Sequence, residues 1–315
     1  MNKFFESFFD SISKLEDELT TIEEESYANI FILGLPRSGT TLLSQLIYRG
    51  TNSLCPNNLM ARFWKSPLVG AYISKLTTKN YHEENMESLM GQTKGLDEPH
   101  EFSWFWQDMM NWSISENGEL QKSGNVDWDR LRLKILSLNK ILDAPIVWKP
   151  LELITDDLNM LSKVFSKSIF IFIDRESEEI ANSIGLIRSS HDDSRKFWGS
   201  IPRNISYEEL INKDIYSQVV DQVFYLRKHY ENVLNEIPKE RLMIIRYKEI
   251  CLSPDKFLEK LVNLSVLNNS KLEKVLNFSK LRSFDNKITN INEVILNKIK
   301  EKGIQGYLFK SSEVF

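Results

Sequence analysis

The stretch from Ile30 to Ile47, IFILGLPRSGTTLLSQLI, most constrains what this chain can fold into. Its first residues, Ile30 to Leu33, are apolar and largely β-branched or aromatic, which predicts a buried strand, and the residues from Thr41 to Tyr48 predict the start of a helix. Gly34 and Gly39 let the backbone between these elements turn tightly. Because the first turn of a helix presents unpaired N–H groups and the positive end of its dipole, the stretch predicts a phosphate-binding loop.

The residues of this loop separate it from the loops of nucleotide triphosphatases. The Walker A pattern, GxxxxGK[ST], needs a lysine directly after its last glycine to reach the β- and γ-phosphates. Here that position is Thr40, and the cation of the loop, Arg37, comes before Ser38 and Gly39. The loop therefore favours one phosphate with a charged group beyond it over a magnesium-bound triphosphate.

The sequence PRSGTT after an apolar strand resembles the 5′-phosphosulfate loop of the sulfotransferases that use 3′-phosphoadenosine 5′-phosphosulfate (PAPS). In that family a later strand ends in an arginine, and a serine about two helical turns further on joins it in gripping the 3′-phosphate. The segment SIFIFIDRESEEIANSIGLIR has Arg175 and Ser183 at this spacing. Arginine offers a phosphate a planar fork of donors. The alternative is a surface arginine at a strand end and an ordinary helical serine.

The resemblance covers the segments 28–50 and 145–265 and implies PAPS as the sulfuryl donor. It extends to IIRYKEICLSPDKFLEKLV, where a strand and a helix capped at Ser253, with Pro254 in its first turn, explain the residues as architecture. The cofactor site that it implies consists of Leu35, Pro36, Arg37, Ser38, Gly39, Thr40, Thr41, Arg175 and Ser183.

Strands and helices alternate along the second half of the chain. The expected order is a strand at Pro145–Pro150, a helix near 156–165, a strand at Ser168–Arg175, helices to about Arg188 and near 215–235, and a strand at Leu242–Tyr247. Such units predict an α/β fold with a P-loop-like parallel sheet flanked by helices, and ligands bind at the carboxyl ends of its strands. With 315 residues, 42% apolar content and no Pro/Gly/Ser-rich linker, we expect one elaborated domain over residues 27–315, with a helical acceptor-side insertion at about 51–140.

An amphipathic helix is predicted for the N-terminal extension, residues 1–26. Apolar residues recur there at helical spacing: Phe4, Phe5, Phe8, Phe9, Ile12 and Leu15. A lid, a dimer contact or a membrane-surface helix would fit this pattern, but the acidic polar face repels anionic lipid. We therefore expect the helix to pack on the body of the protein, and the sequence does not determine the oligomeric state.

Sulfuryl transfer depends on positioning and on donors for developing charge, and it requires no metal in this scheme. Arg37 and the loop N–H groups would stabilise the leaving 3′,5′-bisphosphate. Lys149, in VWKP, looks like the strand-end lysine of tyrosylprotein and related sulfotransferases, and it is the candidate for the bridging oxygen. The alternative is a lysine that only faces solvent.

The general base departs from the family pattern. Relatives use a histidine after the strand-end lysine, where this chain has Pro150 and Leu151, or a glutamate past the loop, where it has Asn57 and Asn58. The segment GLDEPHEFSWFW supplies His100, Glu101 and Glu98, and a neutral histidine beside a carboxylate suits proton abstraction from a hydroxyl. We rank His100 first, then Glu101, then Glu98. The alternative is that both glutamates cap a helix that begins after Pro99.

The acceptor side is less defined by the sequence. Its candidate lining residues, which are equally typical of a core, are Arg62, Trp104, Phe105, Trp106 and Trp112. The acceptor itself is expected to be a small molecule, a sugar or a lipid headgroup. Late in the chain Lys287, Lys302 and Gly303 match no motif and stay outside the predicted site.

Composition limits the setting and the partners. A net charge of −4 and a pI near 5.8 argue against a nucleic-acid binder. The two distant cysteines, Cys55 and Cys251, indicate a reducing compartment and no metal site. The chain has no secretory signal or membrane-spanning run, so we expect a cytoplasmic, bacterial enzyme. Two other classes stay open: a P-loop kinase-like phosphotransferase, with Asp174 as its magnesium ligand, and a non-catalytic nucleotide-binding module.

Overall fold

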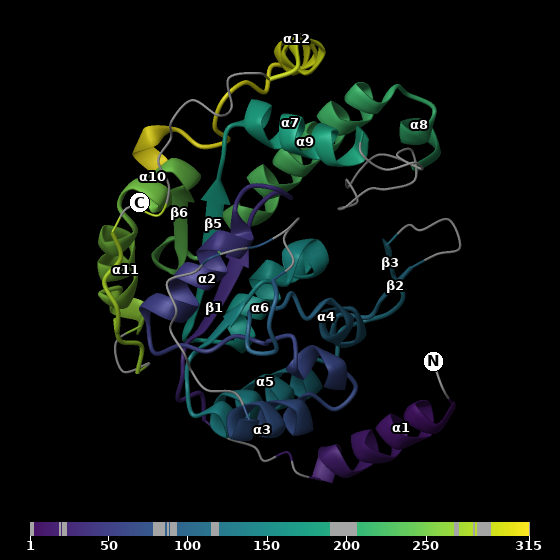
Figure 1. The fold of residues 1–315 in the computed structure, drawn as a ribbon, viewed down its shortest axis with the longest axis vertical. Helices are drawn as coiled ribbons and strands as arrows, with labels where there is room; N and C mark the ends of the chain where they lie inside the picture. Colours follow the sequence, from purple (N-terminus) through teal and green to yellow (C-terminus); the bar gives the residue numbers. More distant parts are fainter. Residues whose placement is uncertain are drawn as a thin grey trace.

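A parallel sheet lies at the centre of the fold, with helices on both of its faces (Figure 1). The computed structural model describes residues 3–18, 20, 24–77, 86, 88, 93–114, 120–189, 207–267, 271–279, 281 and 291–314. Within these residues the strands are β1 (Asn29–Leu33), β4 (Ile146–Trp148), β5 (Ser168–Asp174) and β6 (Leu242–Arg246). Their order is β4-β1-β5-β6, and each neighbouring pair is parallel. The predicted α/β fold with a parallel sheet is confirmed.

Alternation along the strands builds a separate core on each face of the sheet. Phe31 lies opposite Phe170 in the β1–β5 register, and their rings stack with centroids 5.3 Å apart. The intervening residues, such as Ile30 and Ile171, point to the other face. On the first face the core is completed by α3 (Pro67–Thr77), α4 (Ser103–Met109), α5 (Trp128–Leu142), α6 (Leu158–Val164), α7 (Ser177–Ser189), α9 (Ile215–Val233) and α12 (Glu293–Lys302). On the second face it is completed by α2 (Thr40–Gly50), α10 (Tyr247–Leu252) and α11 (Pro254–Val262).

The strand order reverses at β1, because the chain places β4 on one side of it and β5 on the other. Such a switch point is where parallel sheets usually bind ligands. The loop after β1, the end of β4 and the end of β5 therefore meet at one edge of the sheet. Residues Arg37, Lys149 and Arg175 occupy these three places.

The predicted elements of the second half agree with the structure, with small differences at their ends. The predicted helix near 156–165 is a 3-10 turn, η2 (Leu151–Asp157), followed by α6. Tyr247, expected at the end of a strand, is instead the first residue of α10. Pro254 opens α11 as predicted, but the Ser253 side chain makes no capping hydrogen bond.

The predicted helical insertion also contains a strand pair. Its described part has the 3-10 turn η1 (Met60–Phe63), helices α3 and α4, and the antiparallel strands β2 (Trp112–Ile114) and β3 (Leu120–Lys122). The strands are short, and the sequence showed no clean alternation there. The remaining short elements are α8 (Tyr207–Ile211), η3 (Leu234–Glu236), η4 (Lys239–Arg241), η5 (Ser265–Leu267) and η6 (Ser311–Glu313).

The N-terminal helix α1 (Lys3–Glu18) packs on the body through a buried carboxylate. Glu16 forms an ion pair with Lys134 of α5 at 3.0 Å and accepts hydrogen bonds from the backbone N–H groups of Leu68 and Val69 at 3.1 and 3.2 Å. Burial raises the pKa of Glu16, while Lys134 and the two N–H groups oppose that shift. The helix therefore packs on the body, as expected, and the contacts of Glu16 hold its C-terminal end there. Over the described ranges, no helix is both long enough and apolar enough to cross a bilayer.

Glu16→Gln is expected to lower the free energy of unfolding by about 2 kcal/mol, since the amide removes the negative charge that pairs with the buried Lys134 ammonium. Urea unfolding measures the loss. Asp10→Asn is the matched control, because the Lys65–Asp10 pair is largely exposed and contributes at most about 0.5 kcal/mol. Equal losses in the two variants would contradict this account of how α1 is held.

Candidate active site

The loop between β1 and α2 adopts the tight turn that its glycines predict. The N-cap residue of α2 is Gly39, at φ 109°, in the left-handed region, and it supplies no side-chain acceptor to the first turn. The backbone N–H of Ser38 donates to the carbonyl of Leu35 at 3.1 Å, which closes the turn around Pro36 and Arg37. A Cβ atom at Gly39 would lie 2.5 Å from Cδ2 of Tyr247, so the loop and α10 approach too closely for any other residue.

The hydroxyl side chains of the loop suit an anion. Ser38 is fully buried, and its Oγ has no hydrogen-bond partner within the described part of the chain. Thr40 and Thr41 are also buried, in the first turn of α2. A buried hydroxyl without a partner is costly, and an anion in the turn would accept its hydrogen bond. The phosphate-binding role of the loop stays a prediction, to which the Ser38 hydroxyl adds a donor.

The structure brings Arg37, Arg175 and Ser183 together. The Nε of Arg37 donates to Oγ of Ser183 at 3.1 Å, and Nη1 of Arg175 donates to the carbonyl oxygen of Arg37 at 2.8 Å. Burial lowers the pKa of Arg37, and the neighbouring positive charge of Arg175 lowers it further. Two adjacent guanidinium groups at a helix N-terminus form a site that an anion would stabilise.

Two residues that the sequence did not single out orient Arg175. Glu179, in the first turn of α7, accepts a hydrogen bond from Nε of Arg175 at 2.7 Å. The ring of Tyr247 lies under the guanidinium, with its centroid 4.5 Å from the central carbon. The i,i+4 spacing of Arg175 and Glu179 is visible in the sequence, but the contact with Tyr247 arises only from the pairing of β5 with β6.

Lys149 points from the end of β4 into the same region. Its Nζ lies 2.9 Å from Oγ1 of Thr41 and 2.9 Å from Oε1 of Glu101. The side chain is only 4% exposed, in contrast to the solvent-facing alternative, while that of Glu101 is 34% exposed. A predicted strand-end lysine and a predicted base are therefore joined at the phosphate loop.

The other two predicted bases have different surroundings. Nδ1 of His100 accepts a hydrogen bond from the backbone N–H of Phe102 at 2.8 Å, which assigns the ring proton of the neutral form to Nε2. Burial lowers the pKa of His100, Lys149 adds to that shift, and Glu101 opposes it. In this tautomer His100 presents a donor rather than a base.

Glu98 contacts two side chains of α2. It forms an ion pair with Arg49 and accepts a hydrogen bond from Nε2 of Gln45 at 3.2 Å. The alternative that Glu98 and Glu101 cap a helix beginning after Pro99 is wrong. Helix α4 starts at Ser103, and its N-cap residue is Phe102. Of the three side chains, Glu101 lies beside Lys149, whereas His100 presents a donor and Glu98 pairs with Arg49.

The predicted acceptor-side aromatics separate into core and surface. Phe105, Trp106 and Trp112 are buried, as the core alternative holds. Trp104 is 55% exposed, and its ring centroid lies 6.1 Å from that of Trp64. Arg62 is exposed on η1.

The C-terminal segment reaches the same edge of the sheet, which the sequence did not indicate. The carboxylate of Asp174, the last residue of β5, accepts hydrogen bonds from the backbone N–H groups of Leu308 and Phe309 at 3.1 and 2.9 Å. Arg227 donates to the carbonyl oxygens of Gly306 and Tyr307 at 2.8 and 2.9 Å. Burial raises the pKa of Asp174, and the two N–H groups and Arg227 oppose that shift. Both Asp174 oxygens are thus committed to the backbone.

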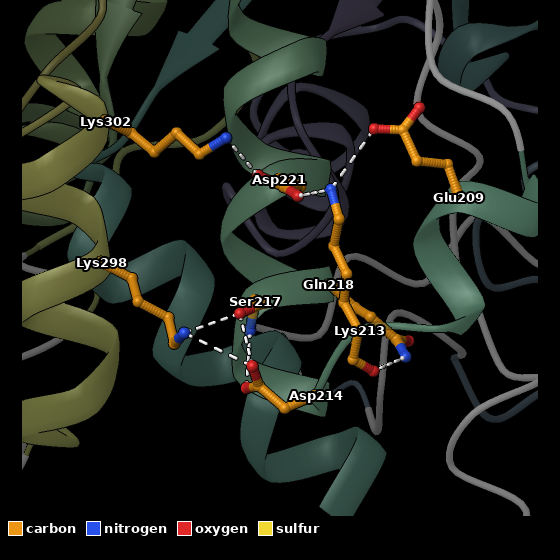
Figure 2. A network of polar contacts seen from close by, with 8 residues as sticks. All are labelled: Glu209, Lys213, Asp214, Ser217, Gln218, Asp221, Lys298 and Lys302. Carbon is orange, nitrogen blue, oxygen red and sulfur yellow. Dashed lines mark hydrogen bonds and ion pairs between the residues drawn. The ribbon is translucent and has the colours of Figure 1, made fainter.

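The helix before this segment is anchored by charge (Figure 2). Lys302 of α12 pairs with Asp221 of α9 at 2.6 Å, and Lys213 pairs with the same carboxylate at 2.8 Å. Lys298 donates to Oγ of Ser217 at 2.6 Å. Lys302 therefore serves to hold α12 on α9, in agreement with its omission from the predicted site, while Lys287 lies outside the described residues.

Potential metal ligands are dispersed across the part of the chain that the structure describes, which has no cluster of three or more His, Cys, Asp or Glu side chains suited to a metal ion. Cys55 and Cys251 are buried thiols that are not joined in a disulfide bond, and burial raises the pKa of Cys55. The charged groups that do converge are Arg37, Lys149 and Arg175. The fold is that of an α/β protein with a candidate anion site at the switch point of its sheet.

Comparison with known proteins assigns the chain to a family. The model of the sulfotransferase family matches residues 29–266, which include the loop, Lys149, Arg175 and Ser183. The chain belongs to the sulfotransferase family. No curated protein sequence matches it.

Three solved structures resemble the chain. Sulfotransferase STF9 from Mycobacterium avium has 13% identity and a TM-score of 0.47, with coverage of 94% of this chain and 79% of that chain. Sulfotransferase STF1 from Mycobacterium tuberculosis H37Rv has 14% identity and a TM-score of 0.47, with coverage of 93% and 80%. The sulfotransferase domain from the curacin biosynthetic pathway has 16% identity and a TM-score of 0.42, with coverage of 90% and 93%.

Proposed function

We propose that this sulfotransferase moves a sulfuryl group from PAPS to a hydroxyl or amine acceptor and releases 3′,5′-bisphosphoadenosine. The observation that carries the proposal is the joining of Arg37, Arg175 and Ser183 beside a phosphate loop whose Ser38 hydroxyl has no partner within the described residues. Two guanidinium groups and a helix N-terminus suit a ligand with two separate phosphates.

The residues of the chain divide between the two ends of such a ligand. The loop N–H groups with Ser38, Thr40 and Thr41 would bind the 5′-phosphate, and Arg175 with Ser183 would bind the 3′-phosphate. Arg37 lies between the two sets, since its backbone carbonyl contacts Arg175 and its side chain contacts Ser183. Leu35 and Pro36 shape the turn.

The reaction that PAPS supplies forms a bond from the acceptor oxygen to sulfur and breaks the bond from sulfur to the bridging oxygen, whose electron pair stays on the bisphosphate. Lys149 would donate to that oxygen, and the contact of its Nζ with Thr41, in the first turn of α2, supports this role. Glu101, whose side chain is partly exposed, would take the proton that the acceptor loses. No step in this scheme requires a metal.

The alternative classes fit these contacts less well. A kinase-like phosphotransferase would use Asp174 for magnesium, but both carboxylate oxygens accept backbone hydrogen bonds from the C-terminal segment. A non-catalytic nucleotide-binding module would not need Lys149 and Glu101 side by side at the loop. As further proposals, the acceptor is a small molecule, a sugar or a lipid headgroup, and the enzyme works in the reducing cytoplasm of a bacterium without nucleic-acid partners.

Calorimetric titration with 3′,5′-bisphosphoadenosine tests the donor. We expect the wild-type chain to prefer this ligand to ATP with magnesium, and Arg175→Ala to weaken its binding by about thirtyfold, since a charge-assisted bidentate contact is lost. Arg246→Ala, which removes an arginine one strand away that contacts Ser311 and Tyr307, is the control and should leave binding within about twofold. Preference for ATP with magnesium, or indifference to Arg175, would reject the proposal.

A further inference from the structure

Lys149 is shared between two groups that the reaction uses at different moments. Its Nζ has equal distances of 2.9 Å to Oγ1 of Thr41, in the first turn of α2, and to Oε1 of the partly exposed Glu101. We propose that Lys149 is a donor-operated switch: without donor it holds Glu101 in an ion pair, and donor binding draws it to the bridging oxygen and releases Glu101 as the base. This inference rests on the proposed function.

The burial of the two partners decides which one moves. The Lys149 ammonium is almost fully enclosed, so it must keep charged or polar partners close by. Glu101 has a third of its side chain in solvent and loses little when the ion pair breaks. When a donor anion enters the turn beside Thr41, Lys149 can replace its contact with Glu101 by a contact with the anion through a small movement. The Glu101 carboxylate is then released from the ion pair.

The exchange has a chemical consequence for the base. A carboxylate oxygen that is held in an ion pair is not free to accept a hydrogen bond from an acceptor hydroxyl, and it becomes available when the ammonium turns away. Lys149 contacts Glu101 from the end of β4, and His100 is the residue before Glu101 in the chain. Burial lowers the pKa of His100 and favours its neutral form, so among the described residues Lys149 is the cation paired with Glu101.

The switch also sets an order of binding. Before the donor is in place, the base is occupied and the acceptor hydroxyl has no group to receive its proton. After the donor is in place, Lys149 and Glu101 have both reached the positions that transfer needs. The donor should therefore bind first, and acceptor activation should follow.

Titration with 3′,5′-bisphosphoadenosine, without acceptor, tests the switch through binding alone. Glu101→Gln should bind this ligand about fivefold more tightly than the wild type, because Lys149 no longer has to leave an ion pair. Lys149→Met should weaken binding about tenfold, and Glu101→Gln should have no further effect in the Lys149→Met background.

Two more variants separate a contact from a general effect of charge. Glu101→Asp keeps the charge but shortens the side chain, so it should also tighten binding. Asp97→Asn removes a charge from the same segment at a residue that has no ion pair with Lys149 among the described residues, so it should leave binding within about twofold. Thermal unfolding of each variant verifies that it folds.

The outcomes are distinct. Tightening by Glu101→Gln that depends on Lys149 establishes the switch. If Glu101→Gln tightens bisphosphate binding equally in the wild-type and Lys149→Met backgrounds, or in neither, the switch is rejected. The proposed donor is not affected by that result. A wild-type chain that fails to bind the bisphosphate rejects the proposed function itself, and the switch with it.

Discussion

Gly39→Ala is expected to weaken the binding of 3′,5′-bisphosphoadenosine by at least about a hundredfold, measured by calorimetry. The backbone of Gly39 is in the left-handed region, and the added Cβ would lie 2.5 and 2.7 Å from two ring carbons of Tyr247. The ring cannot shift freely, because it lies under the Arg175 guanidinium. One methyl group therefore disturbs both the loop and the arginine that are expected to hold the two phosphates.

Gly303→Ala is the matched control for this substitution. Gly303 also has a left-handed backbone, at φ 67°, but a Cβ there would meet nothing within 4 Å. It should therefore lose about 1 kcal/mol of stability and keep ligand binding within about threefold. If both alanine variants bind the bisphosphate equally well, the close approach of the loop to Tyr247 is not needed by the site.

Asp174→Ala is expected to lower the free energy of unfolding by about 3 kcal/mol. The substitution leaves the backbone N–H groups of Leu308 and Phe309 without their acceptor and removes the negative charge beside the buried Arg227. Urea unfolding measures the global loss, and hydrogen exchange at these two amides shows whether the C-terminal segment detaches first.

Asp174→Asn provides the graded comparison. The amide keeps one oxygen that can accept a hydrogen bond, so the loss should be about half that of the alanine variant. A magnesium ligand would behave differently: both variants would fold like the wild type and lose only metal-dependent nucleotide binding. That result would restore the kinase-like alternative.

Local patterns were sufficient for the loop and for the strands around it. The residues 30–47 predict a strand, a turn and a helix because hydrophobic period, glycine position and helix start all act within a few residues. The spacing of Arg175 and Ser183 is local as well, since both lie on one strand and the helix that follows it. The structure adds that Arg37 lies between them, which no spacing could show.

The choice among the candidate bases depended on partners far away in the chain. Glu98 and Glu101 are three residues apart, and nothing in their own segment separates their roles. In the folded chain Arg49, in the last turn of α2, pairs with Glu98, while Lys149, at the end of β4, pairs with Glu101. The ring proton of His100 was likewise assigned by the turn at Phe102.

The sequence by itself determined the sulfotransferase resemblance, the phosphate loop and the parallel sheet, because each follows from side chains that are near neighbours in the chain or repeat with a fixed period. Only the tertiary structure decided that Lys149 meets both Thr41 and Glu101, that Tyr247 supports Arg175, and that Asp174 holds the C-terminal segment. These contacts join strands and helices whose order in the sheet, β4-β1-β5-β6, differs from their order in the chain, so hydrogen bonds and charge pairing across the sheet edge could arise only after folding.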